Sequence, residues 1–252
     1  MSARQDLIDD GVCTLATVPT ALTEALCQAL SRWQHSAPPS HNAYGILQHN
    51  IWQQIPEFQE AMRSGPFGEM AAEVLGERVV LFQDNLIWKP PGTTDRVQWH
   101  QDYAYWPLSA PRGLTMWVAL DDVDVDNGCL HYIPGSHTLG ERQPTNFVSP
   151  GSPSEGSELP PLSWQQREDE ARAMPLSAGD VIAHHPLTWH MSPPNLTKRH
   201  RRAWSLTWIT EDVCWDTTHA PHPFNYFLAP VNGTPLRGDC FPRFSCFPGG
   251  PS

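Results

Sequence analysis

The chain has few positive charges and almost no lysine. Of its 252 residues, 16 are Lys or Arg and 27 are Asp or Glu, which gives a net charge of −11. Only Lys89 and Lys198 are lysines. Proteins that bind nucleic acids or anionic membranes need basic surfaces to contact phosphates. The composition therefore argues against both kinds of partner.

Long apolar runs and export signals are also missing. No apolar run approaches the roughly 20 residues of a membrane span. The opening residues, MSARQDLIDDGV, carry acids where a signal peptide has a basic and then an apolar segment. The six cysteines include no CxxC pair, so we expect mostly free thiols in a reducing compartment. These absences predict a cytoplasmic protein.

Proline is abundant, with 26 residues, and it disfavours long helices. Helical patterns are confined to the first 76 residues, with apolar stripes over 22–33 and 67–75, and the second stripe ends at Gly76. Short apolar segments bounded by Pro, Gly, Asp and Asn follow, which predicts an antiparallel sandwich or barrel. These segments are 79–89, 113–123, 129–133, 180–185 and 202–210.

We expect a single domain over residues 1–252. Residues 1–76 would support a barrel formed by 78–210, and 211–252 would form a C-terminal extension. The barrel is interrupted at 138–178 by a stretch rich in Ser, Pro, Gly and Glu. A loop of this length in a compact domain is typical of an active-site lid, and we expect proteases to cut it within 148–172.

Two short motifs supply candidate metal ligands. In WHQD, His100 and Asp102 would share one face of a strand, with Gln101 turned away. Alone, this triplet is a weak signal, and an ordinary surface or hydrogen-bonded histidine beside an aspartate is the favoured interpretation. The segment 179–195 adds further histidines, and one of them would complete a set of two histidines and one carboxylate. Such a set leaves three metal positions open, which suits non-haem Fe(II) oxygen chemistry.

A basic run, residues 198–202, enters the last predicted strand. An arginine that points into an apolar barrel needs an anionic partner, because a buried unpaired charge is unfavourable. A dicarboxylate co-substrate would be such a partner. Strand parity predicts one face formed by Arg201, Ala203, Ser205 and Thr207, and the opposite face by Arg202 and Trp204.

Six segments in order between residues 82 and 203 carry a family resemblance. They are FQDNLIWKPPG (82–92), WHQD (99–102), LTMWVALDDV (114–123), NGCLHYIPGSH (127–137), GDVIAHHPLTWHMSPPN (179–195) and RRA (201–203). Together they span residues 82 to 203, about half of the chain. The sequence resembles the phytanoyl-CoA dioxygenase (PhyH-like) family of Fe(II)/2-oxoglutarate-dependent oxygenases.

The resemblance implies a double-stranded β-helix, the cupin-like jelly roll, with N-terminal helices that brace one sheet. It implies iron ligands at His100, Asp102 and His190, and 2-oxoglutarate bound by Arg201, with Ser192 on the same carboxylate. Gln83, Thr115 and Trp117 would line the co-substrate pocket, although ordinary barrel lining explains each of them equally well.

The resemblance also implies the reaction. O2 and 2-oxoglutarate would be consumed, succinate and CO2 released, and an unactivated substrate carbon oxidised. Hydroxylation is the expected outcome, with desaturation, epoxidation and ring rearrangement as alternatives. Halogenation is disfavoured, because related halogenases lack the carboxylate that Asp102 supplies here.

The remaining aromatic and imidazole side chains have less specific interpretations. Tyr103, Tyr105 and Trp106 follow the WHQD motif, where the barrel mouth is expected, and would contact substrate or pack in the core. We expect supporting or structural roles for four histidines. They are His131, His137, His184 and His185.

The charge balance bears on the substrate. A coenzyme A thioester carries several phosphates, so the acidic chain favours a small uncharged organic molecule, such as a secondary-metabolite intermediate. Three alternatives remain open: an acyl-CoA hydroxylase of the same family, a cupin-like Zn or Mn hydrolase or isomerase without 2-oxoglutarate, and a non-catalytic binding jelly roll. The sequence does not indicate an oligomeric state.

Overall fold

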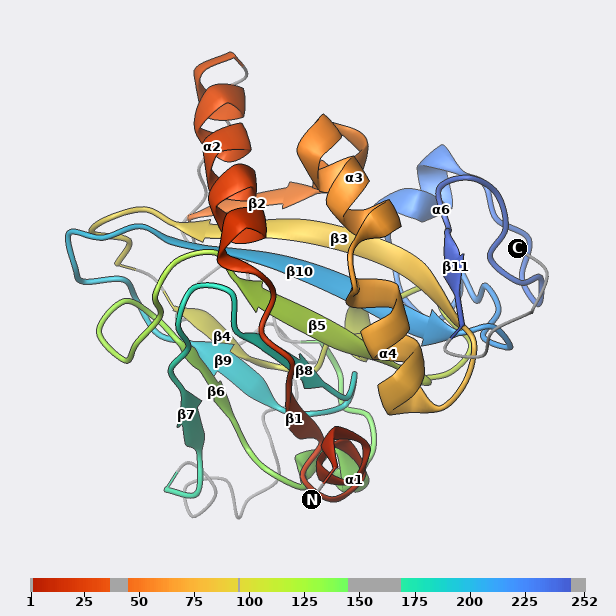
Figure 1. Ribbon diagram of the computed structural model, residues 1–252. Helices are drawn as coiled ribbons and strands as arrows, with labels where there is room; N and C mark the ends of the chain where they lie inside the picture. Colours follow the sequence, from red (N-terminus) through yellow and green to blue (C-terminus); the bar gives the residue numbers. More distant parts are fainter. Residues whose placement is uncertain (1, 37–44, 95, 145–168, 246–252) are drawn as a thin grey trace.

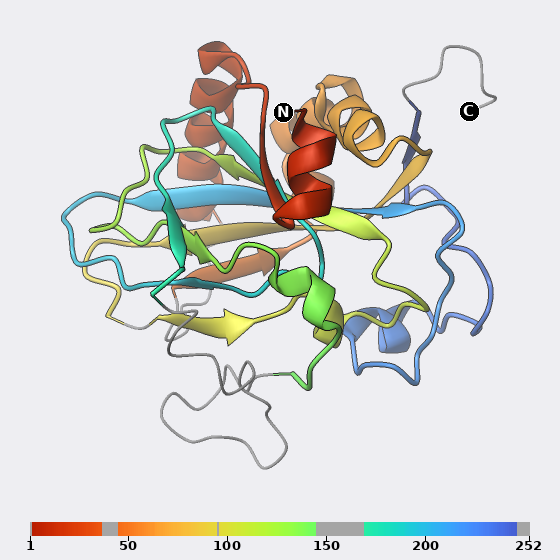
Figure 2. The same ribbon diagram turned by 90° about the horizontal axis from the view of Figure 1, so that it is seen from below.

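A computed structural model describes residues 2–36, 45–94, 96–144 and 169–245. Its strands form two antiparallel sheets that face each other (Figures 1 and 2). The large sheet contains β1 (Val12–Leu15), β8 (Val181–His184), β5 (Gly113–Ala119), β10 (Arg201–Thr210), β3 (Val79–Lys89) and β11 (Arg243–Phe244) in spatial order, and β2 (Ile46–His49) also pairs with β3. The small sheet contains β4 (Val97–His100), β9 (His190–Ser192), β6 (Leu130–Tyr132) and β7 (Arg172–Met174). Two facing antiparallel sheets form the predicted jelly roll.

The N-terminal helices cover the outer face of the large sheet. Figure 1 shows α2, α3 and α4 on the side away from the small sheet. The helices are α1 (Ala3–Asp9), α2 (Thr20–Ser36), α3 (Pro56–Ser64), α4 (Phe67–Leu75) and the short C-terminal α6 (Pro223–Phe227). The predicted stripe over 67–75 is confirmed, and Gly76 ends it with a left-handed φ of 69°. Helix α3 begins at Pro56 and buries Phe58 and Met62.

The strands divide their side chains between two faces. On the outer face, the ring of Trp204 meets Phe58 and Phe67 edge to face, with ring centroids 4.9 and 5.2 Å apart. The outward-facing residues of β3, β5 and β10, such as Leu86, Met116 and Leu206, belong to this core. The alternate residues point into the space between the two sheets, so the fold leaves that space for a functional site.

The C-terminal segment closes one end of the barrel. Trp215, Phe224 and Phe241 pack around Phe82 of β3, and β11 adds a short strand to the edge of β3. Residues 211–245 therefore contribute to the barrel core, a position that the irregular sequence of this segment does not reveal.

The predicted insertion at 138–178 is described only at its two ends. β7 pairs with β6, and Leu176 forms an isolated bridge with Val123, so these residues belong to the barrel. Residues 145–168, which include most of the predicted lid and cleavage region, lie outside the described part. No helix in the described part is long and apolar enough to cross a membrane. The five cysteines described there form no disulfide.

Candidate active site

His100 and Asp102 approach each other through a turn. Strand β4 ends at His100, and Asp102 has helical backbone angles (φ −65°, ψ −41°) at the start of a 3-10 turn over Tyr103–Tyr105. The prediction that both residues lie on one strand is therefore wrong. Gln101 nevertheless points away, because its amide donates to the carbonyls of Leu187 (2.8 Å) and Gly140 (3.0 Å). These bonds hold the turn that directs Asp102 toward His100.

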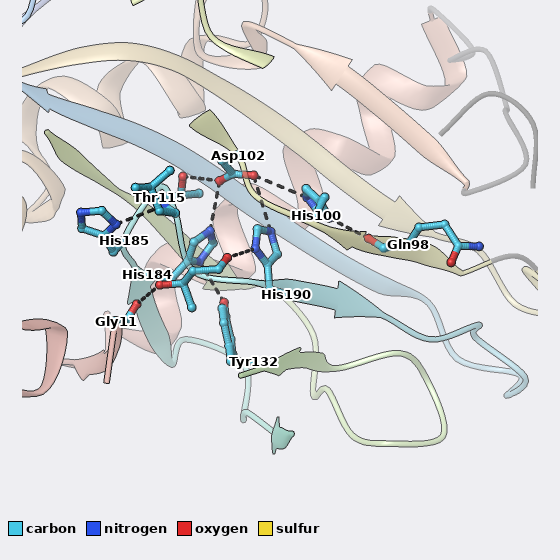
Figure 3. Close-up of polar contacts among 11 residues, drawn as sticks. Gly11, Gln98, His100, Asp102, Thr115, Tyr132, His184, His185 and His190 are labelled. Atoms are coloured by element: carbon cyan, nitrogen blue, oxygen red, sulfur yellow. Dashed lines mark hydrogen bonds and ion pairs between the residues drawn. The ribbon is translucent and has the colours of Figure 1, made fainter. Parts of the chain in front are cut away.

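His190 joins them from the neighbouring strand. β9 pairs with β4 in a register that places His190 opposite His100, with ring centroids 4.0 Å apart. Oδ1 of Asp102 lies 3.5 Å from Nε2 of each histidine. One ligand atom from each of the three residues lies within 4.8 Å of the others. Two imidazoles and a carboxylate therefore converge from two strands and a turn (Figure 3).

Backbone carbonyls orient both imidazoles. Nδ1 of His100 donates to the carbonyl of Gln98 (2.7 Å), and Nδ1 of His190 donates to that of Thr188 (2.9 Å). Each bond places the proton on Nδ1 and leaves the lone pair of Nε2 toward Asp102. This second hydrogen bond is the usual device that fixes a metal-binding histidine.

The other carboxylate oxygen of Asp102 is fully engaged. Oδ2 accepts hydrogen bonds from Oγ1 of Thr115 (2.6 Å) and Nε2 of His184 (3.0 Å). The hydroxyl of Tyr132 then donates to Nδ1 of His184 (2.9 Å). Figure 3 shows this chain leading away from the cluster. Because Oδ2 is occupied in this way, only Oδ1 of Asp102 faces the imidazoles of His100 and His190.

The electrostatics of the cluster suit a divalent cation. Burial acts to raise the pKa of Asp102, but His190, His100 and His184 outweigh it and hold that pKa well below its usual range. Burial, with His100 and His184 nearby, lowers the pKa of His190 well below its ordinary value. Asp102 therefore offers an anionic ligand and His190 a neutral imidazole, the protonation states that metal binding requires.

Arg201 carries an unpaired charge in the same cavity. Its side chain is fully buried, and within the described part only Nη2 has a partner, Oγ of Ser192 at 2.9 Å. Nε and Nη1 donate to nothing there. The guanidinium lies 5.6 Å from the ring of Trp117, and burial lowers its pKa to about 10. An arginine still charged at neutral pH and lacking an anion fits a carboxylate ligand.

Strand parity on β10 is confirmed. Arg201, Ser205 and Thr207 line the cavity. Arg202 points to the other face, where it forms a bidentate ion pair with Asp121 (2.6 and 2.8 Å). The two adjacent arginines therefore differ completely in their surroundings.

The cavity has a volume of about 420 Å³ and lies between the two sheets. Besides His100, Asp102 and His190, its lining includes the predicted Gln83, Thr115, Trp117, Ser192, Arg201 and Trp106. Tyr103 and Tyr105 do not line it. The turn after Asp102 directs Tyr103 into the core, where its hydroxyl donates to the carbonyl of Leu108 (2.9 Å), and Tyr105 packs against the same cluster of apolar side chains.

Of the four histidines with expected supporting or structural roles, His184 lines the cavity, and His131, His137 and His185 do not. His185 accepts from the backbone N–H of Leu187 and packs against the ring of His137. Nε2 of His137 donates to the carbonyl of Ile8, and Nδ1 of His131 to that of Cys129. These contacts tie loops to the barrel.

Sequence reasoning missed three polar residues near the cavity. Asn85 lines it two positions after Gln83, so the parity of β3 could have revealed it. Tyr132 and His222 gave no such signal. Tyr132 reaches the cluster through His184, and His222 reaches Gln83 from the irregular C-terminal segment.

Comparison with known proteins identifies the family. The profile of the phytanoyl-CoA dioxygenase (PhyH) family matches residues 18–203. The chain belongs to the PhyH family. The match includes the metal-ligand cluster and Arg201, while most of β10 and the C-terminal segment lie beyond it.

Two curated relatives illustrate the range of PhyH proteins. A phytanoyl-CoA dioxygenase of Arabidopsis thaliana is 31% identical over 177 residues, which are 70% of this chain and 60% of that protein. A probable alpha-ketoglutarate-dependent hypophosphite dioxygenase of Stutzerimonas stutzeri is 29% identical over 184 residues, or 72% of this chain and 62% of that protein. The chain thus spans about three fifths of the length of these relatives.

Solved structures support the fold. The non-haem alpha-ketoglutarate-dependent carbocyclase SnoK from nogalamycin biosynthesis superposes with a TM-score of 0.81, at 22% identity and 97% coverage of both chains. The epimerase SnoN, solved with Fe3+, alpha-ketoglutarate and nogalamycin RO, superposes with a TM-score of 0.75 at 23% identity and 96% coverage of both chains. The jelly-roll prediction is confirmed.

Proposed function

We propose that this chain is an Fe(II)/2-oxoglutarate-dependent dioxygenase that hydroxylates a carbon of a small organic molecule. One observation carries the proposal. The buried, unpaired guanidinium of Arg201 lines the same cavity as the cluster of His100, Asp102 and His190. A metal site alone would not need this arginine, whereas a metal-bound 2-oxo dicarboxylate has a second carboxylate that requires a cation.

The cavity residues divide into those that hold the metal and those that hold the co-substrate. His100, Asp102 and His190 would bind Fe(II), and Arg201 with Ser192 would bind the far carboxylate of 2-oxoglutarate. When bound, Fe(II) would supply the chemistry by which O2 and 2-oxoglutarate oxidise a substrate carbon, with one oxygen atom entering the substrate C–H bond, the other entering succinate, and CO2 released.

The protein's own part is to orient ligands and to keep water out. Thr115 and His184 restrain Oδ2 of Asp102, so that Oδ1 alone faces the imidazoles. Trp117 forms an apolar wall beside the guanidinium of Arg201, and such a wall strengthens a charge pair by excluding water.

The cavity lining supports an uncharged substrate. Ile46, Leu47, Ile87, Val97 and Trp106 contribute apolar surface, and Arg201 is the only Lys or Arg among the described residues of the lining. SnoK and SnoN act in nogalamycin biosynthesis. We infer a secondary-metabolite intermediate as substrate and propose that residues 1–252 work as one oxygenase domain in the cytoplasm, without nucleic-acid or membrane partners.

To test this function, the protein is loaded with Fe(II) without air and titrated with 2-oxoglutarate. Air is then admitted, and the succinate released is measured. Replacement of His100, Asp102 or His190 by Ala should abolish succinate formation in a protein that stays folded. His185→Ala replaces a half-buried histidine outside the cavity, so it is the matched control and should have a milder effect.

Two outcomes would contradict the assignment. The protein could bind metal without turning over 2-oxoglutarate and show hydrolase or isomerase activity when loaded with Zn or Mn. This result would identify the cupin-like alternative. If His185→Ala lost iron and His190→Ala did not, the assignment of His190 as the second histidine ligand would be wrong.

A further inference from the structure

Two carboxamides line the cavity on β3, two strands away from the strand that carries Thr115. Gln83 and Asn85 are two residues apart on β3, so both side chains point between the sheets. The sheet order places β10 between β3 and β5, which carries Thr115, the partner of Asp102. Adjacent strands are about 4.8 Å apart, so the carboxamides lie roughly 10 Å across the sheet from the metal side.

A histidine holds the carboxamide oxygen of Gln83. Oε1 of Gln83 lies 3.1 Å from Nε2 of His222. Nδ1 of His222 accepts the backbone N–H of Phe224 (3.2 Å), so the proton of the neutral ring is on Nε2. Burial and the nearby His49 lower the pKa of His222 to about 4, which keeps this ring neutral at pH 7. His222 therefore donates its Nε2–H to Oε1 of Gln83. The flipped carboxamide would instead place its own NH2 donor against the Nε2–H donor of His222.

A second histidine holds Asn85 in the same way. Nδ1 of His49 lies 2.5 Å from Oδ1 of Asn85, and a carboxamide oxygen only accepts hydrogen bonds. His49 and His222 come from different ends of the chain, on β2 and at the start of α6, yet each binds one oxygen of this pair. The amide nitrogens of Gln83 and Asn85 have no hydrogen-bond partner in the described part of the chain.

We propose that Gln83 and Asn85 form a paired donor site for the substrate, with His222 and His49 as the residues that position it. The pair binds two acceptor oxygens, such as carbonyl oxygens, about 7 Å apart on an uncharged and largely apolar molecule. Amines and cations are poor ligands, because the exposed carboxamide atoms are donors. This inference rests on the proposed function, which gives Arg201 to the co-substrate and leaves β3 to the substrate.

The donor site can be tested with three small probes of similar shape. 1,4-Diacetylbenzene carries two ketone oxygens, 1,4-diisopropylbenzene replaces each C=O by an isosteric CH–CH3, and p-xylylenediamine carries two ammonium groups. Dissociation constants are measured by ligand-observed NMR on protein loaded with Zn(II) and 2-oxoglutarate. Each neutral hydrogen bond contributes roughly two- to tenfold, so wild type should prefer the diketone over the hydrocarbon at least about fivefold.

Variants assign this preference to individual residues. Gln83→Leu and Asn85→Leu should each weaken diketone binding several-fold and leave hydrocarbon binding unchanged. Gln83→Glu should invert the order in favour of p-xylylenediamine. His222→Phe keeps an aromatic ring against Phe82 and Phe224 but loses the donor, so it should reduce the diketone preference alone. Gln48→Leu on β2 is the control, because Gln48 contacts Gln54 outside the cavity.

The outcomes separate this proposal from the proposed function. Equal binding of the diketone and the hydrocarbon by wild type would overturn the donor site, as would a preference that Gln83→Leu and Asn85→Leu leave unchanged. If Gln83→Leu weakened 2-oxoglutarate more than the diketone, Gln83 would belong to the co-substrate, as the family resemblance implies, and the oxygenase would stand. The probe titrations are repeated without metal and 2-oxoglutarate, so that the donor site is tested even where the proposed function fails.

Discussion

Arg201 and Arg202 are neighbours in sequence with opposite electrostatic surroundings. The guanidinium of Arg201 is buried beside Trp117 with two nitrogens unpaired, whereas Arg202 is already neutralised by Asp121. A buried charge without a counter-ion is retained at a cost in stability, which is reasonable where a ligand supplies the missing anion.

This difference leads to a prediction about 2-oxoglutarate. Arg201→Leu should weaken its binding by about 2–5 kcal/mol, because a desolvated charge pair is lost. The ligand-free variant should melt at the same temperature as wild type or higher, since it no longer buries an unpaired charge. Calorimetric titration and thermal melts measure both effects. Arg202→Leu is the matched control, and equal losses in 2-oxoglutarate affinity would contradict the parity argument.

A second prediction concerns His184, which anchors Oδ2 of Asp102. His184→Leu should lower Fe(II) affinity by roughly 10- to 100-fold, since partners that orient a metal ligand commonly contribute that much. Tyr132→Phe should have a smaller effect, because it removes only the bond to the far side of His184. Anaerobic competition with a chelator gives the affinities. If His185→Ala lowered the affinity as much as His184→Leu, the chain of hydrogen bonds through His184 would not explain the effect.

Among the secondary-structure elements, β3 contributes side chains to both faces of the large sheet. Its inward residues line the cavity, while Asp84 points outward into the core under the helices. There Asp84 is fully buried, and Oδ2 accepts from the backbone N–H of Trp52 (3.1 Å) and the indole N–H of Trp204 (2.7 Å). Oδ1 has no partner in the described part of the chain. Burial raises the pKa of Asp84 to about 7, against the two hydrogen bonds that lower it.

This carboxyl should make stability depend on pH. A raised folded pKa means that the folded state binds the proton more tightly, so the stabilisation is complete below the unfolded pKa of about 4 and is lost as pH rises to about 7. Wild type should therefore lose stability relative to Asp84→Asn as the pH rises from 5 to 8. The difference between their free energies of unfolding should change by at most roughly 1.4 kcal/mol per pH unit below pH 7. Urea unfolding at several pH values measures it. A difference independent of pH would show that Asp84 is ionised throughout.

For the whole molecule, the net charge of −11 and the placement of the cations bear on the substrate. Lys89 is buried and donates to the backbone carbonyls of Ser192 and Pro193. Arg112 pairs with Glu77 and Asp212. Neither is available as a simple phosphate contact, and the acidic surface repels polyanions at low ionic strength.

We therefore predict no productive binding of acyl-CoA thioesters. Succinate release should exceed its substrate-free rate with uncharged terpenoid, polyketide-like or other oxygen-bearing compounds and not with a panel of acyl-CoA thioesters. Mass analysis of the product gives the reaction outcome. Stoichiometric oxidation of a CoA thioester, weakened by added salt, would contradict the prediction and favour the acyl-CoA hydroxylase.

The sequence by itself determined the long strands, α4, the order of the ligand segments and the two faces of β10, because period-two alternation and glycine caps are local. It did not reveal β1, β2, β7 or β9, because strands this short depend on their partners; the equally short β6 and β8 were predicted only because they lie in the longer apolar segments 129–133 and 180–185. Only the tertiary structure decided the turn at Asp102, the removal of Tyr103 from the cavity, and the contacts of His49 and His222 with the carboxamides of β3. Each depends on residues far apart in the chain that meet only when the two sheets and the C-terminal segment close around one cavity.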